Sequence, residues 1–244
     1  MTRDLFLIGA GGTGSFLYPA LIRFLNTTKR EDGREYTLTV IDGKLVAEEK
    51  LYRQLFSLDH IGNNKAAALV EQYDHDPAVI IALPDYLRPE NIQVLPDGAY
   101  VLIAADNFPV RARIEDWCGN LTNATVINGG NEMTDGSMQI YLRRDGVDVT
   151  PRLSQGHPEI LQLDRDDPAT LSCDAIAALP GGQQTIIANM MSATAILNGL
   201  RHVLQMEKAL PAEEWPFHMP EEVFFDMDTF AMRATQRPTE PTPS

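Results

Sequence analysis

The sequence feature that most constrains the fold lies within the first fourteen residues. Four apolar residues at 5–8 precede the run Gly9-Ala10-Gly11-Gly12-Thr13-Gly14, and a further apolar stretch follows it. A short apolar run bounded by glycines is typical of a strand buried on both faces, and the residues after the run predict a helix. The chain is therefore expected to begin with a buried strand that turns sharply into a helix.

The glycines of this turn predict a nucleotide site. Gly9, Gly11 and Gly14 have the spacing G-x-G-x-x-G, and Gly12 lies between them. Glycines at this spacing permit a tight turn, close approach of the backbone to phosphate, and close packing of helix on strand. A glycine-rich turn without a ligand is the alternative interpretation. The position between a strand and a helix favours the nucleotide, because free N–H groups at a helix N-terminus bind phosphate.

Apolar periodicity in the remaining chain predicts alternating strands and helices. Strands are expected at 36–41, 79–83, 100–105, 124–128, 137–142, 223–227 and 230–234, and helices at 13–25, 63–70, 110–121 and 183–204. The stretch 26–35 is polar and is expected to be a surface loop. The strand at 137–142 alternates in polarity, which is typical of antiparallel pairing. The pattern predicts an α/β fold with a Rossmann-like, mostly parallel sheet, helices on both faces and an antiparallel extension.

The domain organisation follows from length and local composition. The 244 residues suffice for one large core, and we expect a single domain over 1–235. Residues 143–182 are rich in Asp, Pro and Gly and have no apolar period, so a long loop is expected there. The Pro- and Thr-rich segment 236–244 is expected to be disordered.

Composition excludes several classes of function. The formal net charge is −14, which argues against nucleic-acid binding because phosphate backbones are met by clustered Lys and Arg. No run has the length of a membrane span or the pattern of a signal peptide, so we expect a cytoplasmic protein without membrane contact. The two cysteines, Cys118 and Cys173, cannot form a disulfide framework or a four-cysteine zinc site.

Two acidic positions follow predicted strands. Asp42 comes after 36–41, and Asp106 with Asn107 comes after 100–105. Ligands in open α/β sheets bind at the carboxyl ends of the strands. A carboxylate at Asp42 suits the hydroxyls of a ribose, and one at Asp106 suits Mg²⁺, which binds one or two carboxylates together with substrate phosphates. Capping of a helix N-terminus is the alternative for each acid.

Two basic residues lie in the sequence between the predicted strands 36–41 and 100–105. Arg53, with Gln54 beside it, and Lys65 are suited to polyphosphate, since a guanidinium fork and an ammonium group bind phosphates and stabilise charge that develops during transfer. Surface salt bridges are the alternative for both cations. An NAD-binding turn does not require two added cations, because a dinucleotide pyrophosphate is held by the backbone.

The order of these motifs resembles the ThiF/MoeB/HesA superfamily, whose members activate ubiquitin-like and sulfur-carrier proteins. The motifs that carry the resemblance are Gly9–Ser15, Asp42, Leu51–Phe56, Ile61–Ala66, Ala105–Arg111 and Ser172–Cys173 ahead of a long apolar helix. The chain is most similar to the ThiF-type protein of the PRTRC system. The resemblance implies that ATP and the C-terminal glycine of a β-grasp carrier protein form an acyl-adenylate and pyrophosphate.

The resemblance also implies roles for individual residues. Asp42 matches the ribose ligand, Arg53 and Lys65 the phosphate ligands, and Asp106 the magnesium ligand. The whole nucleotide-binding set is Gly9, Gly11, Gly12, Gly14, Asp42, Arg53, Gln54, Lys65, Asp106 and Asn107. Arg53, Lys65, Asp106 and Cys173 are the expected catalytic residues.

Two cysteines and one helix have further expected roles. Cys118 matches a cysteine that packs in the family's core, whereas Cys173 resembles one that in some members accepts the activated carrier as a thioester or persulfide. The family forms two-fold homodimers. The helix at 183–204 has too many apolar residues for a helix buried on one side only, including Met190, Met191 and Ile196, which predicts that it contributes to such an interface.

Two departures from the family pattern leave alternatives open. Lys44 stands where the family carries a second acid, and Lys50 stands where it carries an asparagine. Metal binding then depends on Asp106 alone. A non-catalytic protein that retains the fold is therefore one alternative, and an NAD-dependent oxidoreductase, permitted by the glycines and Asp42, is another.

Overall fold

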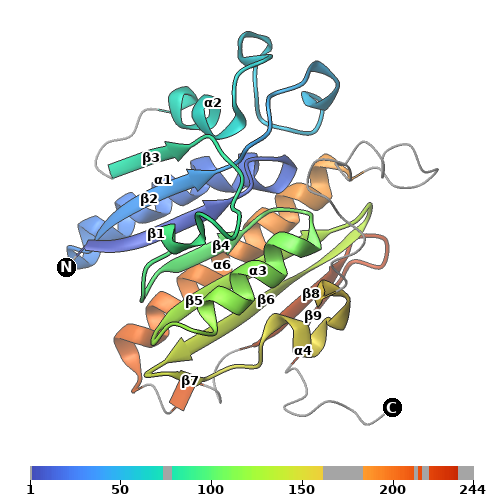
Figure 1. The fold of residues 1–244 in the computed structure, drawn as a ribbon. Helices are drawn as coiled ribbons and strands as arrows, with labels where there is room; N and C mark the ends of the chain where they lie inside the picture. Colours follow the sequence, from blue (N-terminus) through green and yellow to red (C-terminus); the bar gives the residue numbers. More distant parts are fainter. Residues whose placement is uncertain (1, 74–78, 162–183, 212–213, 216–219, 236–244) are drawn as a thin grey trace.

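The fold is built on one mixed sheet with helices packed on both of its faces (Figure 1). The computed structural model describes residues 2–73, 79–161, 184–211, 214–215 and 220–235. The strands are β1 (Thr2–Ile8), β2 (Glu35–Ile41), β3 (Val79–Leu83), β4 (Tyr100–Ile103), β5 (Ala124–Asn131), β6 (Asp135–Arg144), β7 (Val147–Asp148), β8 (Glu222–Asp226) and β9 (Ala231–Thr235). The α-helices are α1 (Gly12–Asp32), α2 (Lys65–Gln72), α3 (Phe108–Cys118), α4 (Leu153–Gly156) and α6 (Ile186–Ala209). Short 3₁₀ helices are η1 (Glu48–Lys50), η2 (Leu58–His60), η3 (Ile92–Val94) and η4 (Pro158–Leu161).

The strand order confirms the predicted fold class. The order is β3-β2-β1-β4-β5-β6-β8-β9, with β7 paired to β6. The first five strands in this order are parallel, and β6, β8 and β9 continue the sheet in antiparallel pairs. A parallel order of 3-2-1-4-5 belongs to the Rossmann type, in which ligands bind at the carboxyl ends of the central strands.

Each face of the sheet has its own hydrophobic core. In β1, Leu5 and Leu7 point into the core that includes α1 and α6, whereas Phe6 and Ile8 point into the core that includes α3. Both pairs are almost completely buried. This explains why β1 is apolar without alternation, since helices cover the strand on either side. Figure 1 shows α6 and α3 on opposite faces of the sheet.

The first helix is longer than predicted. The prediction of a surface loop at 26–35 is wrong, because most of this stretch belongs to the helix. α1 continues to Asp32 and ends at Gly33, whose φ of 71° gives a left-handed cap. Thr27 and Thr28 donate their hydroxyl groups to backbone carbonyls four residues earlier, within the helix. The polar residues of this stretch lie mainly on the outer side of a regular helix, where low hydrophobicity does not prevent helix formation.

The prediction of a long loop at 143–182 is wrong for residues 143–161, most of which form regular elements. β6 runs to Arg144, a tight turn follows at 145–146, and β7, α4 and η4 occupy most of the chain from Val147 to Leu161. The carboxylate of Glu115 on α3 accepts hydrogen bonds from the backbone N–H and hydroxyl of Ser154. Local polarity therefore concealed short elements that are held by contacts with α3.

The remaining boundaries differ by a few residues from those predicted. β5 extends to Asn131, and α6 begins at Ile186 and continues to Ala209. Residues 162–183, which include Cys173, and the tail 236–244 lie outside the described residues. Among the helices of the described ranges, none has the length and apolar character needed to cross a membrane.

Candidate functional site

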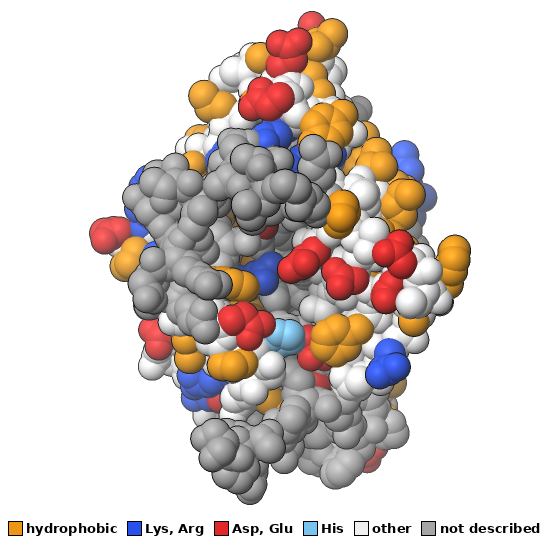
Figure 2. All heavy atoms as spheres, turned by 90° about the vertical axis from the view of Figure 1, so that its right-hand side faces the viewer, with side chains coloured by type: hydrophobic (Ala, Val, Ile, Leu, Met, Phe, Trp, Pro, Cys, Tyr) orange, Lys and Arg blue, Asp and Glu red, His pale blue; other side chains and the backbone are white. Residues whose placement is uncertain are grey.

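A cleft of about 1340 Å³ lies at the carboxyl ends of the parallel strands. It extends from the glycine turn to the β8–β9 hairpin, which also contributes to its walls. Figure 2 shows this side of the molecule, where carboxylate side chains and a histidine gather beside a hollow. Its volume exceeds the range of about 300–1,000 Å³ that is usual for small-molecule pockets, so it has room for more than a nucleotide.

The glycine turn has the close packing that its spacing predicts. Gly9 adopts a φ of 95°, and a Cβ there would lie 2.9 Å from the backbone nitrogen of Ala105. A Cβ at Gly14 would overlap the carbonyl oxygen of Gly9. At Gly11, in contrast, the nearest atom to an added Cβ is 3.9 Å away, so the turn is open there. Gly9, Gly11 and Gly12 line the cleft, and Gly14 does not, because it packs inward against the turn.

Asp42 lines the cleft and braces the glycine turn. Its Oδ2 accepts from the backbone N–H of Ala10 at 2.7 Å, and its Oδ1 accepts from that of Lys44 at 2.8 Å. Each carboxylate oxygen has a further lone pair available. The acid at the end of β2 therefore shapes the turn and still presents acceptor capacity to the cleft, as expected for a ribose ligand.

Arg53 lies behind the cleft wall. Arg53 is only 3 % exposed, and its Nη1 donates to Oε1 of Gln184 at 3.4 Å. Within the part of the chain that the structure describes, its Nε and Nη2 have no hydrogen-bond partner, and neither does Oε1 of the neighbouring Gln54. Gln54 lines the cleft, whereas Arg53 does not. A buried cation with unpaired donors is costly, so the free N–H groups of Arg53 are suited to an anionic ligand.

Lys65 reaches the cleft from the start of α2. It is 6 % exposed and lines the cleft, and Asn64 caps the helix by accepting from the backbone N–H of Ala67. The side-chain amide of Asn64 also donates to the backbone oxygen of Asp42 at 2.8 Å. The asparagine cap thereby fixes the start of α2 beside the end of β2 and brings Lys65 close to the predicted ribose site.

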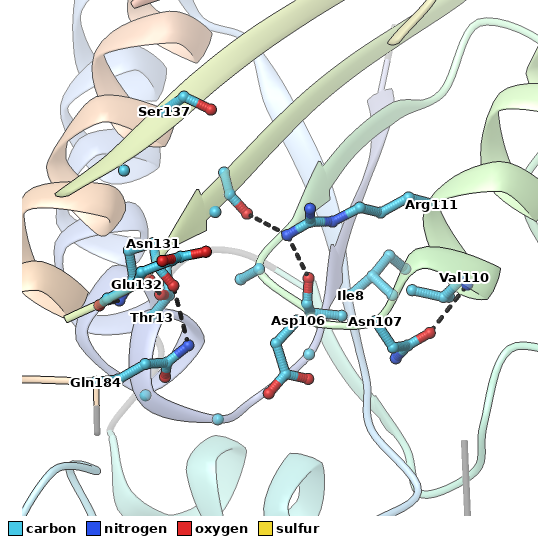
Figure 3. Close-up of a pocket in the computed structure, with 18 of the residues that line it drawn as sticks. Ile8, Thr13, Asp106, Asn107, Val110, Arg111, Asn131, Glu132, Ser137 and Gln184 are labelled. Atoms are coloured by element: carbon cyan, nitrogen blue, oxygen red, sulfur yellow. Dashed lines mark hydrogen bonds between the residues drawn. The ribbon is translucent and has the colours of Figure 1, made fainter. Parts of the chain in front are cut away.

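The end of β4 carries Asp106, Asn107 and, on α3, Arg111 (Figure 3). Asp106 is exposed, whereas Asn107 caps α3 by accepting from the backbone N–H of Val110 at 3.0 Å. Burial lowers the pKa of Arg111, and the negative charge of Asp106 opposes this shift. Asp106 can serve as a cleft ligand, and Asn107 has a structural role as a helix cap in addition to its place in the lining.

Arg111 holds the ends of β4 and β5 together. Its Nη2 donates to the backbone oxygens of Ala105 at 3.1 Å and Gly129 at 3.3 Å (Figure 3). An added Cβ at Gly130 would lie 2.9 Å from the same nitrogen. The sequence motif containing Arg111 gave no role for this residue, and the structure shows that it fixes the backbone where the two strands meet the cleft.

A second group of polar residues was not predicted, and two of them, His157 and Glu159, line the cleft. His157, from the segment after α4, has Nε2 at 2.6 Å from Oε1 of Glu222 and Nδ1 at 2.8 Å from Oε1 of Glu159. Gln139 donates to the same oxygen of Glu222 at 2.9 Å and accepts from Asn128 at 3.0 Å. The hydrogen bond with Glu222 raises the pKa of His157, with burial opposing it. These residues come from segments that are separated widely in sequence, so local motifs could not reveal the network.

The donor set permits a magnesium ion only in combination with phosphates. In the described parts of the chain, no three His, Cys, Asp or Glu side chains are grouped as ligands of a metal ion. Asp106 alone would hold Mg²⁺, the remaining ligands being phosphate oxygens and water. For ATP, the open backbone at Gly11 and the unpaired donors of Arg53 fit a polyphosphate.

Comparisons with known proteins give relatives of the same fold. E. coli MccB in complex with MccA-N7isoASN matches with a TM-score of 0.71 at 15% identity, over 99% of this chain and 66% of that one. E. coli MccB with ATP gives a TM-score of 0.66 at 16% identity, over 99% and 66%. PaaA gives 0.65 at 17% identity, over 96% and 64%. The chain thus spans slightly less than two thirds of each of these structures.

Sequence comparison is more specific about the family. No curated protein matches the chain significantly. The family model described as "ThiF family" matches residues 2–238, which includes all nine strands of the sheet and the whole cleft. The chain therefore belongs to the ThiF family.

Proposed function

We propose that this protein catalyses ATP-dependent adenylation of the C-terminal carboxylate of a small β-grasp protein of the ubiquitin-like or sulfur-carrier type. Membership of the ThiF family supports adenylation, and structures of E. coli MccB include one with ATP. The narrower assignment to the PRTRC type stays a prediction from the sequence motifs.

The observation that carries the proposal is the state of Arg53. Its guanidinium is buried and donates to Gln184, which lines the cleft, with Nε and Nη2 lacking partners among the described residues. Lys65 is also buried and, unlike Arg53, lines the cleft itself. A pair of buried cations beside a backbone phosphate cradle suits a triphosphate, whose charge increases at the bridging oxygen as pyrophosphate leaves.

The chemistry requires positioning more than proton transfer. The carrier's carboxylate is already ionised, so one of its oxygens attacks the α-phosphorus without a general base. The bond between the α- and β-phosphates breaks and pyrophosphate departs with the electron pair. Arg53 and Lys65 stabilise that developing charge, Asp42 orients the ribose, and Asp106 would hold the magnesium ion that neutralises phosphate charge.

The size of the cleft supports a macromolecular second substrate. Beyond the glycine turn, its walls continue along β6, β8 and β9, where Ser137, Phe224 and Ala231 line it. MccB has been crystallised with the peptide MccA and its analogues. A cleft of this length can admit an extended C-terminal tail together with ATP.

Pyrophosphate exchange tests the proposal directly. The protein is incubated with labelled pyrophosphate, ATP, Mg²⁺ and a panel of β-grasp proteins that end in glycine, and incorporation of label into ATP is measured. We expect exchange only with a cognate carrier, and its loss when the carrier's terminal glycine is removed. Calorimetry compares ATP with NAD, and tighter binding of NAD would replace the proposal with the oxidoreductase alternative.

Transfer to Cys173 is a separate part of the proposal. The thiolate would attack the carbonyl carbon of the acyl-adenylate, forming a thioester and releasing AMP. Cys173→Ser is expected to retain pyrophosphate exchange and to abolish any reductant-sensitive adduct with the carrier, detected on denaturing gels. Loss of exchange in a folded Cys173→Ser protein would contradict this role, because adenylation requires only the nucleotide site.

A further inference from the structure

A buried asparagine of α6 connects two segments at the glycine-turn end of the cleft. Asn189 is fully buried. Its Nδ2 donates to the backbone oxygen of Arg53 at 3.3 Å, and its Oδ1 accepts from Nδ2 of Asn131 at 3.1 Å. One side chain therefore links the segment that carries Arg53 with the end of β5.

The same amide lies directly against the glycine turn. A Cβ at Gly12 would overlap the side-chain amide of Asn189, so the backbone of the turn rests on that amide. In addition, Thr13 donates its hydroxyl group to Oδ1 of Asn131 at 3.0 Å. The turn is thus in contact with both asparagines, and packing against Asn189 requires a glycine at position 12.

Gln184 forms a second bridge to Arg53. Its Oε1 accepts from Nη1 of Arg53 at 3.4 Å, and its Nε2 donates to the backbone oxygen of Asn131 at 3.2 Å (Figure 3). Arg53 is consequently held at its backbone by Asn189 and at its guanidinium by Gln184. Both contacts are anchored on Asn131, which itself lines the cleft.

We propose that Asn189 is a positioning residue that places Arg53 beside the glycine turn for contact with the phosphates. The role of Arg53 itself rests on the proposed function. The Nδ2 group of Asn189 donates to the buried backbone oxygen of Arg53. Removal of this donor leaves that oxygen without a hydrogen bond inside the protein, which costs free energy. Without this donor, the segment around Arg53 is expected to move toward solvent, taking the guanidinium out of register with the turn.

Asn189→Asp tests the placement of Arg53 without reference to ATP. The substitution preserves shape and replaces the Nδ2 donor by a carboxylate oxygen, which repels the carbonyl of Arg53. Because Arg53 is 3 % exposed, trypsin should cleave after it slowly in the native protein. We expect the fragment ending at Arg53 to form about tenfold faster in Asn189→Asp, as measured by mass spectrometry.

Ser192→Ala is the matched control for this experiment. Ser192 lies on the same helix, is fully buried, and its hydroxyl group has no hydrogen-bond partner in the described ranges. Its substitution should leave cleavage after Arg53 unchanged. If Asn189→Asp does not fold, Asn131→Asp is assayed instead. Asn131 is half-buried, and this substitution removes the Nδ2 group that donates to Oδ1 of Asn189. Unchanged cleavage at Arg53 in the folded variant would overturn the proposal.

Kinetics distinguish positioning from a purely structural role. In pyrophosphate exchange, Asn189→Asp should lower kcat about tenfold and change KM for ATP less than about threefold. In an Arg53→Ala background, the same substitution should cause little further loss, since it acts through Arg53. If the double variant instead loses kcat by the product of the two single losses, the proposal is overturned. Absence of exchange in the wild-type protein would defeat the proposed function alone, and the trypsin result would still decide the placement of Arg53.

Discussion

At the scale of single residues, burial decides which charged groups matter. Arg53 and Lys65 are both nearly inaccessible, whereas Asp106 is exposed and Asp42 uses one lone pair of each oxygen to brace the backbone. Arg53 is kept in the interior at a cost in stability, because two of its guanidinium nitrogens have no hydrogen-bond partner among the described residues. That cost is characteristic of groups that wait for a charged ligand.

Arg53→Ala should affect activity much more than folding. Removal of a donor that acts on developing charge lowers the rate by about two to three orders of magnitude, and we expect this loss in pyrophosphate exchange. The melting temperature should change little, because two of the three guanidinium nitrogens have no partner to lose among the described residues. Arg201→Ala, on the exposed side of α6, is the control and should retain full exchange. Equal activity in the two variants would show that Arg53 does not contact the phosphates.

His157 should make stability depend on pH. Its pKa is raised in the folded protein, chiefly by the hydrogen bond with Glu222 and further by Glu159, with burial opposing both. The imidazolium therefore stabilises the fold fully below the unfolded pKa of about 6.5, and this contribution is lost as pH rises through the higher folded value.

The measurement compares urea unfolding of the wild type with that of His157→Gln between pH 5.5 and pH 8.5. The free-energy difference between the two proteins should be largest at the acidic end and should shrink as pH increases. A difference that is constant or grows with pH would show that His157 does not carry its charge between the two carboxylates.

At the scale of elements, the turn between β1 and α1 is specified by two different demands on glycine. Gly14 must lack a side chain because the backbone of Gly9 occupies the space, whereas Gly11 faces open space in the cleft. The backbone φ of Gly11, −80°, is also accessible to residues other than glycine. Thus one glycine of the pattern serves helix packing, and the other leaves room for a ligand.

Gly14→Ala and Gly11→Ala should separate these demands. Overpacking at Gly14 is expected to reduce the free energy of unfolding by about 2–3 kcal/mol, as measured by chemical denaturation. Gly11→Ala should cost less than about 1 kcal/mol, and it should weaken ATP binding in calorimetry because the methyl group projects toward the phosphates. Equal destabilisation by both substitutions would contradict the packing described for Gly14.

At the scale of the whole molecule, one exposed apolar area stands out near the cleft. Ile186, Ile187 and Met190, at the start of α6, are between 45% and 60% exposed. Ile196, which the sequence analysis named with Met190 among the apolar residues that predict an interface, is instead fully buried in the chain's own core. The apolar residues of α6 therefore divide between the core and an outer area that we propose as part of a homodimer interface.

Sedimentation velocity tests this interface. The wild-type protein should sediment as a dimer, and Ile187→Glu should shift it to a monomer because a charge would be buried at the contact. Gln205→Glu adds the same charge at an exposed site further along α6 and should leave the dimer intact. A wild-type protein that stays monomeric at all concentrations would exclude the interface.

The sequence by itself determined the Rossmann-like core and half of the site. Apolar runs, glycine spacing and acids after strands are local features, and they correctly placed β1, the glycine turn and Asp42 at the end of β2. Only the tertiary structure decided that Asn189 supports the glycine turn and that His157 meets Glu222. The contacts joining these groups span segments far apart in the chain, and their partners depend on how α6 and β8 pack onto the sheet. No local pattern of residues encodes such distances, because they arise from the burial of whole helices and strands against one another.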